Sequence, residues 1–162
     1  MWTGRIRVGP SPRRKVETPA RPRILFLCTG NSCRSQMAEG WARELLEEQV
    51  EPYSAGIETH GLNPHAVAVM AEAGVDISGH TSKTMSSLAG IRFDLVITVC
   101  GHADKNCPVF PGNTRVMHVG FDDPPALAGD EQDPLKRLSH YRRVRGEIRS
   151  FIATLPDLFP PA

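Results

Sequence analysis

The stretch that decides the fold covers residues 28–35 and reads Cys28-Thr29-Gly30-Asn31-Ser32-Cys33-Arg34-Ser35. A short apolar run at 24–27 precedes it, and apolar residues at helical spacing follow it over 37–45. A buried strand, a turn of small residues and a helix, in this order, leave the backbone N–H groups of the turn without partners. The helix dipole adds partial positive charge at the same place. The sequence therefore predicts an oxyanion-binding loop, the cradle, at residues 28–35.

Three side chains of the cradle bear on its chemistry. Arg34 offers a planar fork of N–H donors that matches two oxygens of a tetrahedral anion. Cys28 lies where the positive field is strongest, which favours its thiolate, and Ser35 can donate a hydrogen bond to that sulfur. The alternative is an inert cysteine at the end of a strand. The spacing Cys-x5-Arg-Ser between a strand and a helix favours a nucleophile that attacks phosphate or a phosphate mimic.

The composition is that of one domain without a membrane span. The chain has 162 residues, and no apolar run approaches the ~18 residues that a span needs. The net charge is +1, but residues 1–23 hold seven basic residues and one acidic residue, which leaves the rest at −5. This balance argues against nucleic-acid binding by the domain. Four cysteines without a small disulfide framework indicate a reducing, cytoplasmic compartment.

Residues 1–22 are predicted to be a basic, proline-rich and flexible extension, and residues 23–162 a single catalytic domain. Four prolines interrupt any periodic pattern in the extension, and its like charges repel one another. It has no apolar segment of the kind found in signal peptides. A basic arm for an anionic partner is the alternative to a solvated extension, and the second is favoured.

The alternation of apolar runs and helical patterns predicts an α/β fold with a four-stranded parallel sheet and helices on both faces. The expected strands are 23–28, 52–56, 93–100 and 115–119, and the expected helices are 35–48, 64–74 and 134–152. Connections long enough to hold helices give parallel strands. The cradle then lies at the carboxyl edge of the sheet, where open α/β sheets bind ligands.

Two further cysteines are expected at this edge. Cys100 ends the third strand, and Cys107 follows seven residues later, just before Pro108. They are either incidental core cysteines, part of a weak metal site with His102, or a relay of thiols. A zinc site needs about four ligands, and every cysteine of the chain lies in the cradle or in this segment. The relay is therefore favoured.

Residues 100–107 cannot form one regular helix in every redox state of such a relay. Seven helical steps place the two Cα atoms about 10 Å apart, whereas a disulfide tolerates only about 4.4–6.8 Å. We expect a helix or turn in the reduced protein that loops out when Cys100 and Cys107 are joined.

A pair of acids, Asp122 and Asp123, follows the fourth strand in what should be a stiff loop. A carboxylic acid held over a bound anion can protonate a leaving oxygen. Asp123 is the better candidate because Pro124 restricts its direction. The alternative is an ordinary Asp-Pro turn.

These motifs together resemble the thioredoxin-coupled arsenate reductases, which share the low-molecular-weight tyrosine phosphatase fold. The resemblance covers about residues 23–155. It rests on the stretches 28–41, 53–61 and 120–124 and on the pair Cys100 and Cys107. The cradle alone resembles both reductases and phosphatases, so the cysteine pair carries the distinction.

The resemblance implies a role for each motif. Cys28 is the nucleophile on arsenate, Asp123 is the general acid, and Cys100 and Cys107 relay two electrons so that arsenite leaves. The oxyanion is bound by Arg34 and the rest of the loop, namely Thr29, Gly30, Asn31, Ser32, Cys33 and Ser35. Thioredoxin reduces the Cys100–Cys107 disulfide, so no tightly bound cofactor is implied. A weak phosphatase activity is expected from the same cradle.

Some members of this family bind a potassium ion behind the loop. The matching positions here are Asn31, Glu39, Ser54, Thr81 and Lys83. The last carries a carboxylate in cation-binding members. Lys83 should repel a monovalent cation or replace it with its own ammonium, so we expect no metal site. Glu39 is otherwise a solvated glutamate.

Two other functions stay open. A tyrosine phosphatase would need an aromatic approach to Cys28, but the chain has two tyrosines and neither is next to Asp123 in sequence. A redox or arsenite-binding sensor would use Cys100 and Cys107 without turnover. We expect a monomer that binds arsenate and thioredoxin and neither nucleic acid nor membrane.

Overall fold

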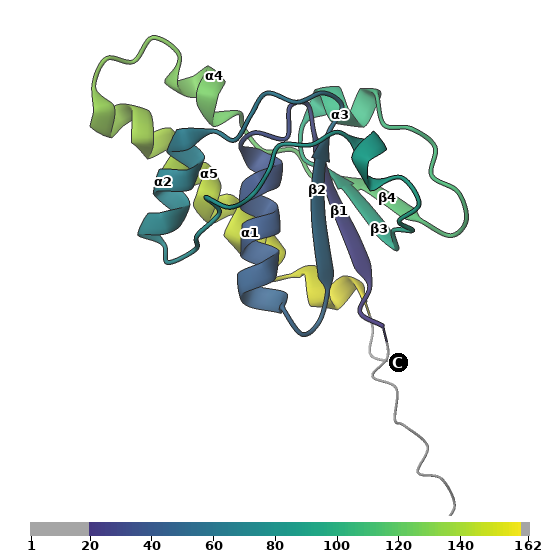
Figure 1. Cartoon of the computed structure of the whole chain (residues 1–162). Helices are drawn as coiled ribbons and strands as arrows, with labels where there is room; N and C mark the ends of the chain where they lie inside the picture. Colours follow the sequence, from purple (N-terminus) through teal and green to yellow (C-terminus); the bar gives the residue numbers. More distant parts are fainter. Residues whose placement is uncertain (1–19, 160–162) are drawn as a thin grey trace, which may run out of the picture.

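The computed structural model describes residues 20–159 of the chain (Figure 1). Most of the expected extension at 1–22 lies outside the described residues. Its last residue already belongs to the domain, because the carbonyl of Pro22 accepts from the N–H of Glu51 at 2.9 Å.

The predicted four-stranded parallel sheet is confirmed. Its strands are β1 (Arg23–Cys28), β2 (Glu51–Gly56), β3 (Leu95–Thr98) and β4 (Arg115–His118), in the order β2-β1-β3-β4. The third strand ends before Cys100, because that residue becomes the N-cap of the next helix. Strand β1 is central and buried on both faces, with Ile24, Leu25, Phe26 and Leu27 all at 0% exposure.

Three helices lie together on one side of the sheet, α1 (Arg34–Leu46), α2 (Pro64–Glu72) and α5 (Pro134–Ile152) (Figure 1). Their starts follow from local chemistry. Asn63 accepts from two N–H groups of the first turn of α2, and Asp133 accepts from one in α5, each before a proline at the first helical position. The interior of this layer includes Trp41, which is 5% exposed and stacks under the guanidinium of Arg149.

Four short helical elements complete the fold, namely η1 (Met85–Leu88), α3 (Gly101–Lys105), α4 (Pro124–Ala128) and η2 (Leu155–Leu158). Of these, α3 is the helix or turn expected between Cys100 and Cys107, and the other three were not expected as helices. The expected stiff loop after Asp123 is a helix, because Pro124 has the backbone geometry of a first helical residue. The partly buried Met85, Leu88 and Ile91 pack against the core from η1 and the segment after it.

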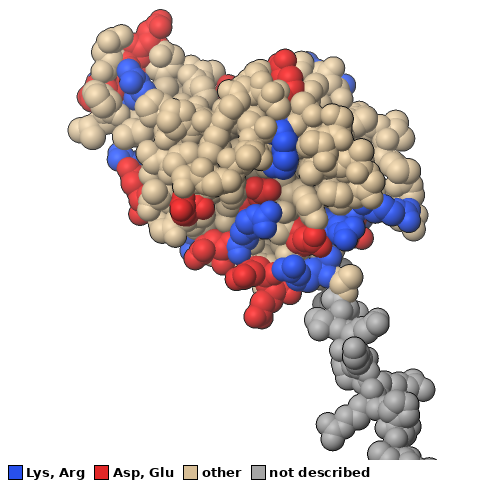
Figure 2. All heavy atoms as spheres, viewed as in Figure 1, with Lys and Arg blue, Asp and Glu red and all other residues tan. Residues whose placement is uncertain are grey.

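Charges of both signs are mixed on the face seen in Figure 2, where Lys and Arg side chains lie beside Asp and Glu near the first described residues. Within residues 20–159, no helix combines the length and the hydropathy of a membrane-spanning segment.

Candidate active site

The cradle is a tight loop between β1 and α1 that surrounds the sulfur of Cys28. This residue is 4% exposed, and its Sγ lies 2.8 Å from Oγ of Ser35, the contact expected from the sequence. The N–H of Asn31 also donates to this sulfur at 3.2 Å. The Asn31 N–H therefore offers this sulfur one hydrogen-bond donor, and the Ser35 hydroxyl can offer a second.

Asn31 determines the shape of the cradle. It adopts a left-handed backbone conformation with φ of 48°, and it is fully buried. Its side-chain Nδ2 donates to Oγ of Ser35 at 2.9 Å and to Oγ of Ser54 at 3.0 Å. Because Ser35 accepts from Asn31, its own proton is free for Cys28. Asn31 therefore orients the group that touches the nucleophile.

A small residue is required at Gly30. A Cβ there would lie 2.3 Å from Nδ1 of His60, whose ring covers this part of the loop. His60 in turn contacts the carboxylate of Glu58 at 3.0 Å. Sequence reasoning did not single out His60, although it follows the second strand at the same sheet edge as Cys28.

Arg34 and Asp123 lie together over the cradle. Nη1 of Arg34 donates to the carbonyl of Phe121 at 3.0 Å, and Nη2 lies 3.5 Å from Oδ1 of Asp123. Asp123 precedes α4 but its side chain caps no N–H group, which leaves the carboxylate available. The neighbouring Asp122 pairs instead with Arg143 at 2.8 Å. The structure thus places Asp123, and not Asp122, beside Arg34.

The second thiol reaches the cradle as well. Sγ of Cys100 lies 3.3 Å from Oγ1 of Thr29, the residue that follows Cys28. Cys100 is 3% exposed, and its sulfur accepts from the N–H of Ala103 at the start of α3. Cys107 lies beyond α3 and is only partly buried. All four cysteines are free thiols in this structure.

Burial controls the ionisation of the other two thiols. It raises the pKa of Cys33 far above the ordinary thiol range, and the nearby Asp123 carboxylate adds to the effect. Burial also raises the pKa of Cys107, and the negative charge of Asp104 makes a second, smaller contribution in the same direction. Cys33 therefore stays protonated. The segment that contains His102 is a turn of helix rather than a ligand set, and no cluster of three His, Cys, Asp or Glu side chains that could hold a metal occurs among residues 20–159.

A pocket of about 340 Å³ opens over Cys28. Its lining comes from the cradle and from two neighbouring segments, the loop before α2 and the start of α4: Cys28, Thr29, Gly30, Ser32, Cys33, Arg34, His60, Asn63, Asp123 and Pro125. Asn63 was predicted as a helix cap, which it is, but it also donates to the hydroxyl of Tyr141 at 3.3 Å. Burial raises the pKa of Tyr141, the hydrogen bond from Asn63 opposes this rise, and the charge of Asp123 adds to it. A tyrosine distant in sequence is therefore close to the site, which the sequence did not indicate.

The positions considered for a monovalent cation come together behind the cradle, where hydrogen bonds within the protein already reach several of their oxygens. Nε2 of Gln36 lies 3.0 Å from Oδ1 of Asn31 and 3.1 Å from the carbonyls of Asn31 and Thr81. The N–H of Lys83 donates to the same Oδ1 at 2.9 Å, and its Nζ lies 3.3 Å from the Thr81 carbonyl. The oxygens that would bind a cation thus already have N–H donors.

Glu39 completes this arrangement. It is 4% exposed, so the alternative of a solvated glutamate is wrong. Its carboxylate lies 3.0 Å from Nδ1 of His80 and 3.6 Å from Arg43. Burial lowers the pKa of both His80 and Lys83, whereas the Glu39 carboxylate opposes that shift in each. Because the lowered pKa of His80 favours its neutral imidazole, Arg43 is the charged partner that lies within ion-pair distance of the Glu39 carboxylate.

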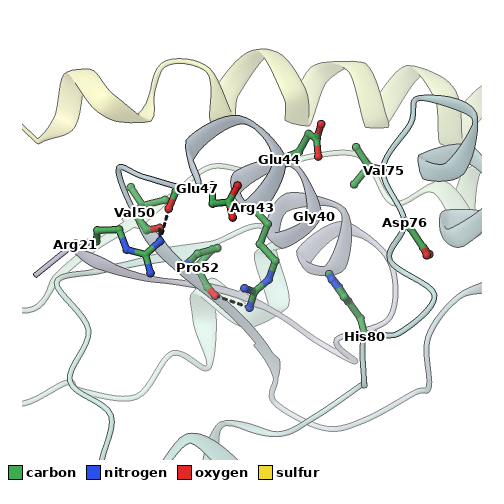
Figure 3. Close-up of a pocket in the computed structure, with 10 residues that line it drawn as sticks. All are labelled: Arg21, Gly40, Arg43, Glu44, Glu47, Val50, Pro52, Val75, Asp76 and His80. Carbon is green, nitrogen blue, oxygen red and sulfur yellow. Dashed lines mark hydrogen bonds between the residues drawn. The ribbon is translucent and has the colours of Figure 1, made fainter.

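A second, larger hollow of about 420 Å³ lies along α1 and contains no cradle residue (Figure 3). Arg43 donates to the carbonyl of Pro52 at 3.1 Å, and Arg21 donates to the carbonyl of Glu47. Both acidic and basic side chains line it, and its lining contains no cysteine, serine or threonine. The cradle is therefore the candidate active site.

Comparisons with known proteins agree with this geometry. The family described as low molecular weight phosphotyrosine protein phosphatase matches residues 23–157. A protein of Staphylococcus saprophyticus subsp. saprophyticus named arsenate reductase 2 is 54% identical over 134 residues, which cover 83% of this chain and 95% of that protein. An arsenate reductase of Halalkalibacterium halodurans is 49% identical, covering 83% of this chain and 94% of the relative.

Solved structures of arsenate reductases and of a tyrosine phosphatase are also similar to this chain. A structure described as an arsenate reductase in oxidized state has a TM-score of 0.68 and 32% identity, covering 82% of this chain and 95% of that one. A low molecular weight protein tyrosine phosphatase from T. tengcongensis has a TM-score of 0.62 and 29% identity, covering 85% of this chain and 99% of that one.

Proposed function

The chain belongs to the low molecular weight phosphotyrosine protein phosphatase family, and within this family we propose that it is an arsenate reductase that takes its electrons from thioredoxin. The observation that carries the proposal is the thiol of Cys100 at 3.3 Å from Thr29. A phosphatase needs one thiol in the cradle, whereas a reductase needs a second thiol that can reach the first. Relatives that are about half identical and are named arsenate reductases support the same conclusion.

The first step is capture of arsenate. The Cys28 thiolate attacks arsenic and forms a sulfur–arsenic bond while Arg34 and the cradle N–H groups hold the oxygens. Asp123 gives its proton to the departing oxygen, which leaves as water. The contacts of Cys28 with Ser35 and Asn31 support this role, because they stabilise the attacking thiolate.

The second step is reduction. The Cys100 thiolate attacks the sulfur of Cys28, the sulfur–arsenic bond breaks, and its electron pair stays on arsenic, which leaves as arsenite. The product is a Cys28–Cys100 disulfide. Cys107 then attacks Cys100, so that Cys28 leaves as a thiolate and a Cys100–Cys107 disulfide remains. The two electrons that the thiols lose are the two that arsenic gains.

The cycle closes when a dithiol reductant reduces the Cys100–Cys107 disulfide. Thioredoxin is the proposed partner, so the enzyme needs no tightly bound cofactor. Reduced thiols require a reducing compartment, and we place the reaction in the cytoplasm with the protein as a monomer. The partly buried Cys107, followed by exposed Pro108 and Val109, supports access to the disulfide from outside.

The test is NADPH consumption in the presence of arsenate, thioredoxin and thioredoxin reductase, compared with hydrolysis of an aryl phosphate. We expect sustained NADPH oxidation that depends on arsenate, with only weak hydrolysis. Fast hydrolysis without NADPH oxidation would instead identify a phosphatase, which the cradle and Asp123 could also serve. Tight arsenite binding without either activity would identify a sensor.

A further inference from the structure

The short helix α3 is the segment that must change between the reduced protein and a Cys100–Cys107 disulfide. It has five residues, whereas helices in water need about 12–15 to be stable alone. Contacts with the domain therefore hold it. Two of them are the fully buried Ala103 and the sulfur of Cys100, which caps the helix by accepting from the Ala103 N–H at 3.4 Å.

A third contact joins α3 to the sheet through Thr98, the last residue of β3. The Thr98 side chain is fully buried, and its Oγ1 lies 2.9 Å from Nδ1 of His118 and 3.5 Å from Oδ1 of Asp104. A hydroxyl has a single proton to donate. When His118 donates to Thr98, the Thr98 proton is free to point at the Asp104 carboxylate.

The resulting chain of donors runs from β4 through β3 to α3, which lies over the carboxyl end of the sheet (Figure 1). The contact between Thr98 and Asp104 is long for a hydrogen bond, so it is a weak tether that local unwinding can release.

Asp104 also acts on the second cysteine of the relay. Its carboxylate adds to the effect of burial in raising the pKa of Cys107. Only a thiolate attacks a disulfide. While α3 is intact, Asp104 therefore disfavours the reactive form of Cys107.

Unwinding of α3 removes both the contact of Asp104 with Thr98 and the effect of Asp104 on Cys107. The two Cα atoms must approach to about 4.4–6.8 Å for a disulfide, which the helical path between them does not allow. Asp104 lies within that path, so closure of the loop displaces its carboxylate from Thr98.

We propose that Asp104 is a positioning residue that sets the order of the thiol relay. It holds α3 on the sheet and Cys107 apart from Cys100 until Cys100 has attacked Cys28. This inference rests on the proposed function, and it adds that α3 protects the resting dithiol from premature oxidation.

The test uses a protein with Cys28→Ser and Cys33→Ser, in which Cys100 and Cys107 are the two remaining thiols. Diamide, an azo oxidant, takes two electrons and two protons from them and leaves the disulfide. Asp104→Asn should be oxidised about three- to tenfold faster, the range expected for loss of one hydrogen bond. Asp130→Asn removes the same charge from the exposed loop between α4 and α5 and should match the parent.

A second readout separates positioning from mere structural support. With Cys100 also replaced by Ser, the pH midpoint for alkylation of Cys107 should fall in Asp104→Asn and stay at the parent's value in Asp104→Glu. Hydrogen exchange of amides 101–107 in the otherwise unchanged chain should be faster in Asp104→Asn.

An unchanged oxidation rate or an unchanged Cys107 midpoint in Asp104→Asn would overturn the proposal. Equal acceleration in Asp130→Asn would overturn it too. None of these measurements uses arsenate, so their failure is distinct from a failure of the proposed reductase activity, which would appear as absent NADPH oxidation in the unmodified protein.

Discussion

Replacement of Arg34 by lysine separates charge from geometry in the cradle. Arg34 is 14% exposed at its side chain, and its two terminal nitrogens serve different partners, the carbonyl of Phe121 and the carboxylate of Asp123. The same planar fork can hold two oxygens of a tetrahedral anion, whereas an ammonium holds them as a point charge. Arg34→Lys keeps the charge but loses one directed hydrogen bond to the anion.

The magnitude follows from that loss. A hydrogen bond to a charged group contributes about 1.5–3 kcal/mol. Since each 1.36 kcal/mol is tenfold in rate, kcat/KM for arsenate should fall by roughly 10- to 150-fold. Binding of inorganic phosphate, measured by calorimetry, should weaken in the same direction, because phosphate has the same shape and charge.

Arg143→Lys is the matched control. Arg143 also makes two ion pairs, with Asp122 at 2.8 Å and Glu147 at 2.7 Å, but it is exposed and does not line the pocket. Its kcat/KM should stay within about twofold of the parent's, since exposed pairs contribute little. A kcat/KM within twofold of the parent in Arg34→Lys would refute the assignment of Arg34 as the bidentate anion clamp.

Three further predictions concern other parts of the chain. Cys28→Ser should abolish both arsenate reduction and aryl phosphate hydrolysis. Cys100→Ser and Cys107→Ser should abolish sustained arsenate reduction and leave aryl phosphate hydrolysis intact. Loss of hydrolysis in Cys100→Ser or Cys107→Ser would show that the cradle and the thiol relay do not act separately. Potassium chloride should change turnover no more than sodium chloride, because Lys83 and Gln36 already donate to the oxygens behind the cradle; a saturable rise with potassium alone would contradict this. Two arginines of α5, first by hydrogen bonding, lower the pKa of Glu72 from 4.5 to about 2, so its contribution to stability is present above pH 4.5 and is lost as pH falls toward 2. Between pH 4.5 and pH 2, the melting temperature of Glu72→Gln should therefore fall less than that of the parent. Parallel curves of melting temperature against pH would argue against the ion pairs between Glu72 and these arginines.

Much of the fold could be predicted because its signals are local. The strand–loop–helix around Cys28 and the caps at Asn63 and Asp133 depend on residues adjacent in sequence, and the structure has them where expected. The same locality explains why Asp123 could be chosen over its neighbour. Pro124 was expected to stiffen a loop, but it starts the helix α4. The fixed φ angle of proline suits both a loop and the first residue of a helix.

What could not be predicted depends on tertiary contacts. Nothing near Tyr141 in sequence indicates that α5 brings it to Asn63. Gln36 donates to the carbonyl of Thr81 from the buried side of α1, and these two residues are 45 positions apart in the sequence. Burial of Glu39 could not be predicted either, because its partner His80 belongs to the connection after α2, which has no periodic sequence pattern.

The most direct test of the account is a single turnover of Cys107→Ser with arsenate and no thioredoxin. Without Cys107 the relay should stop at its first disulfide, because the one remaining thiol, Cys33, is buried and stays protonated. We predict release of one arsenite per protein and a Cys28–Cys100 disulfide that peptide mass spectrometry detects. A free Cys100 thiol, with no arsenite released, would contradict the proposed reduction of arsenate by these two cysteines.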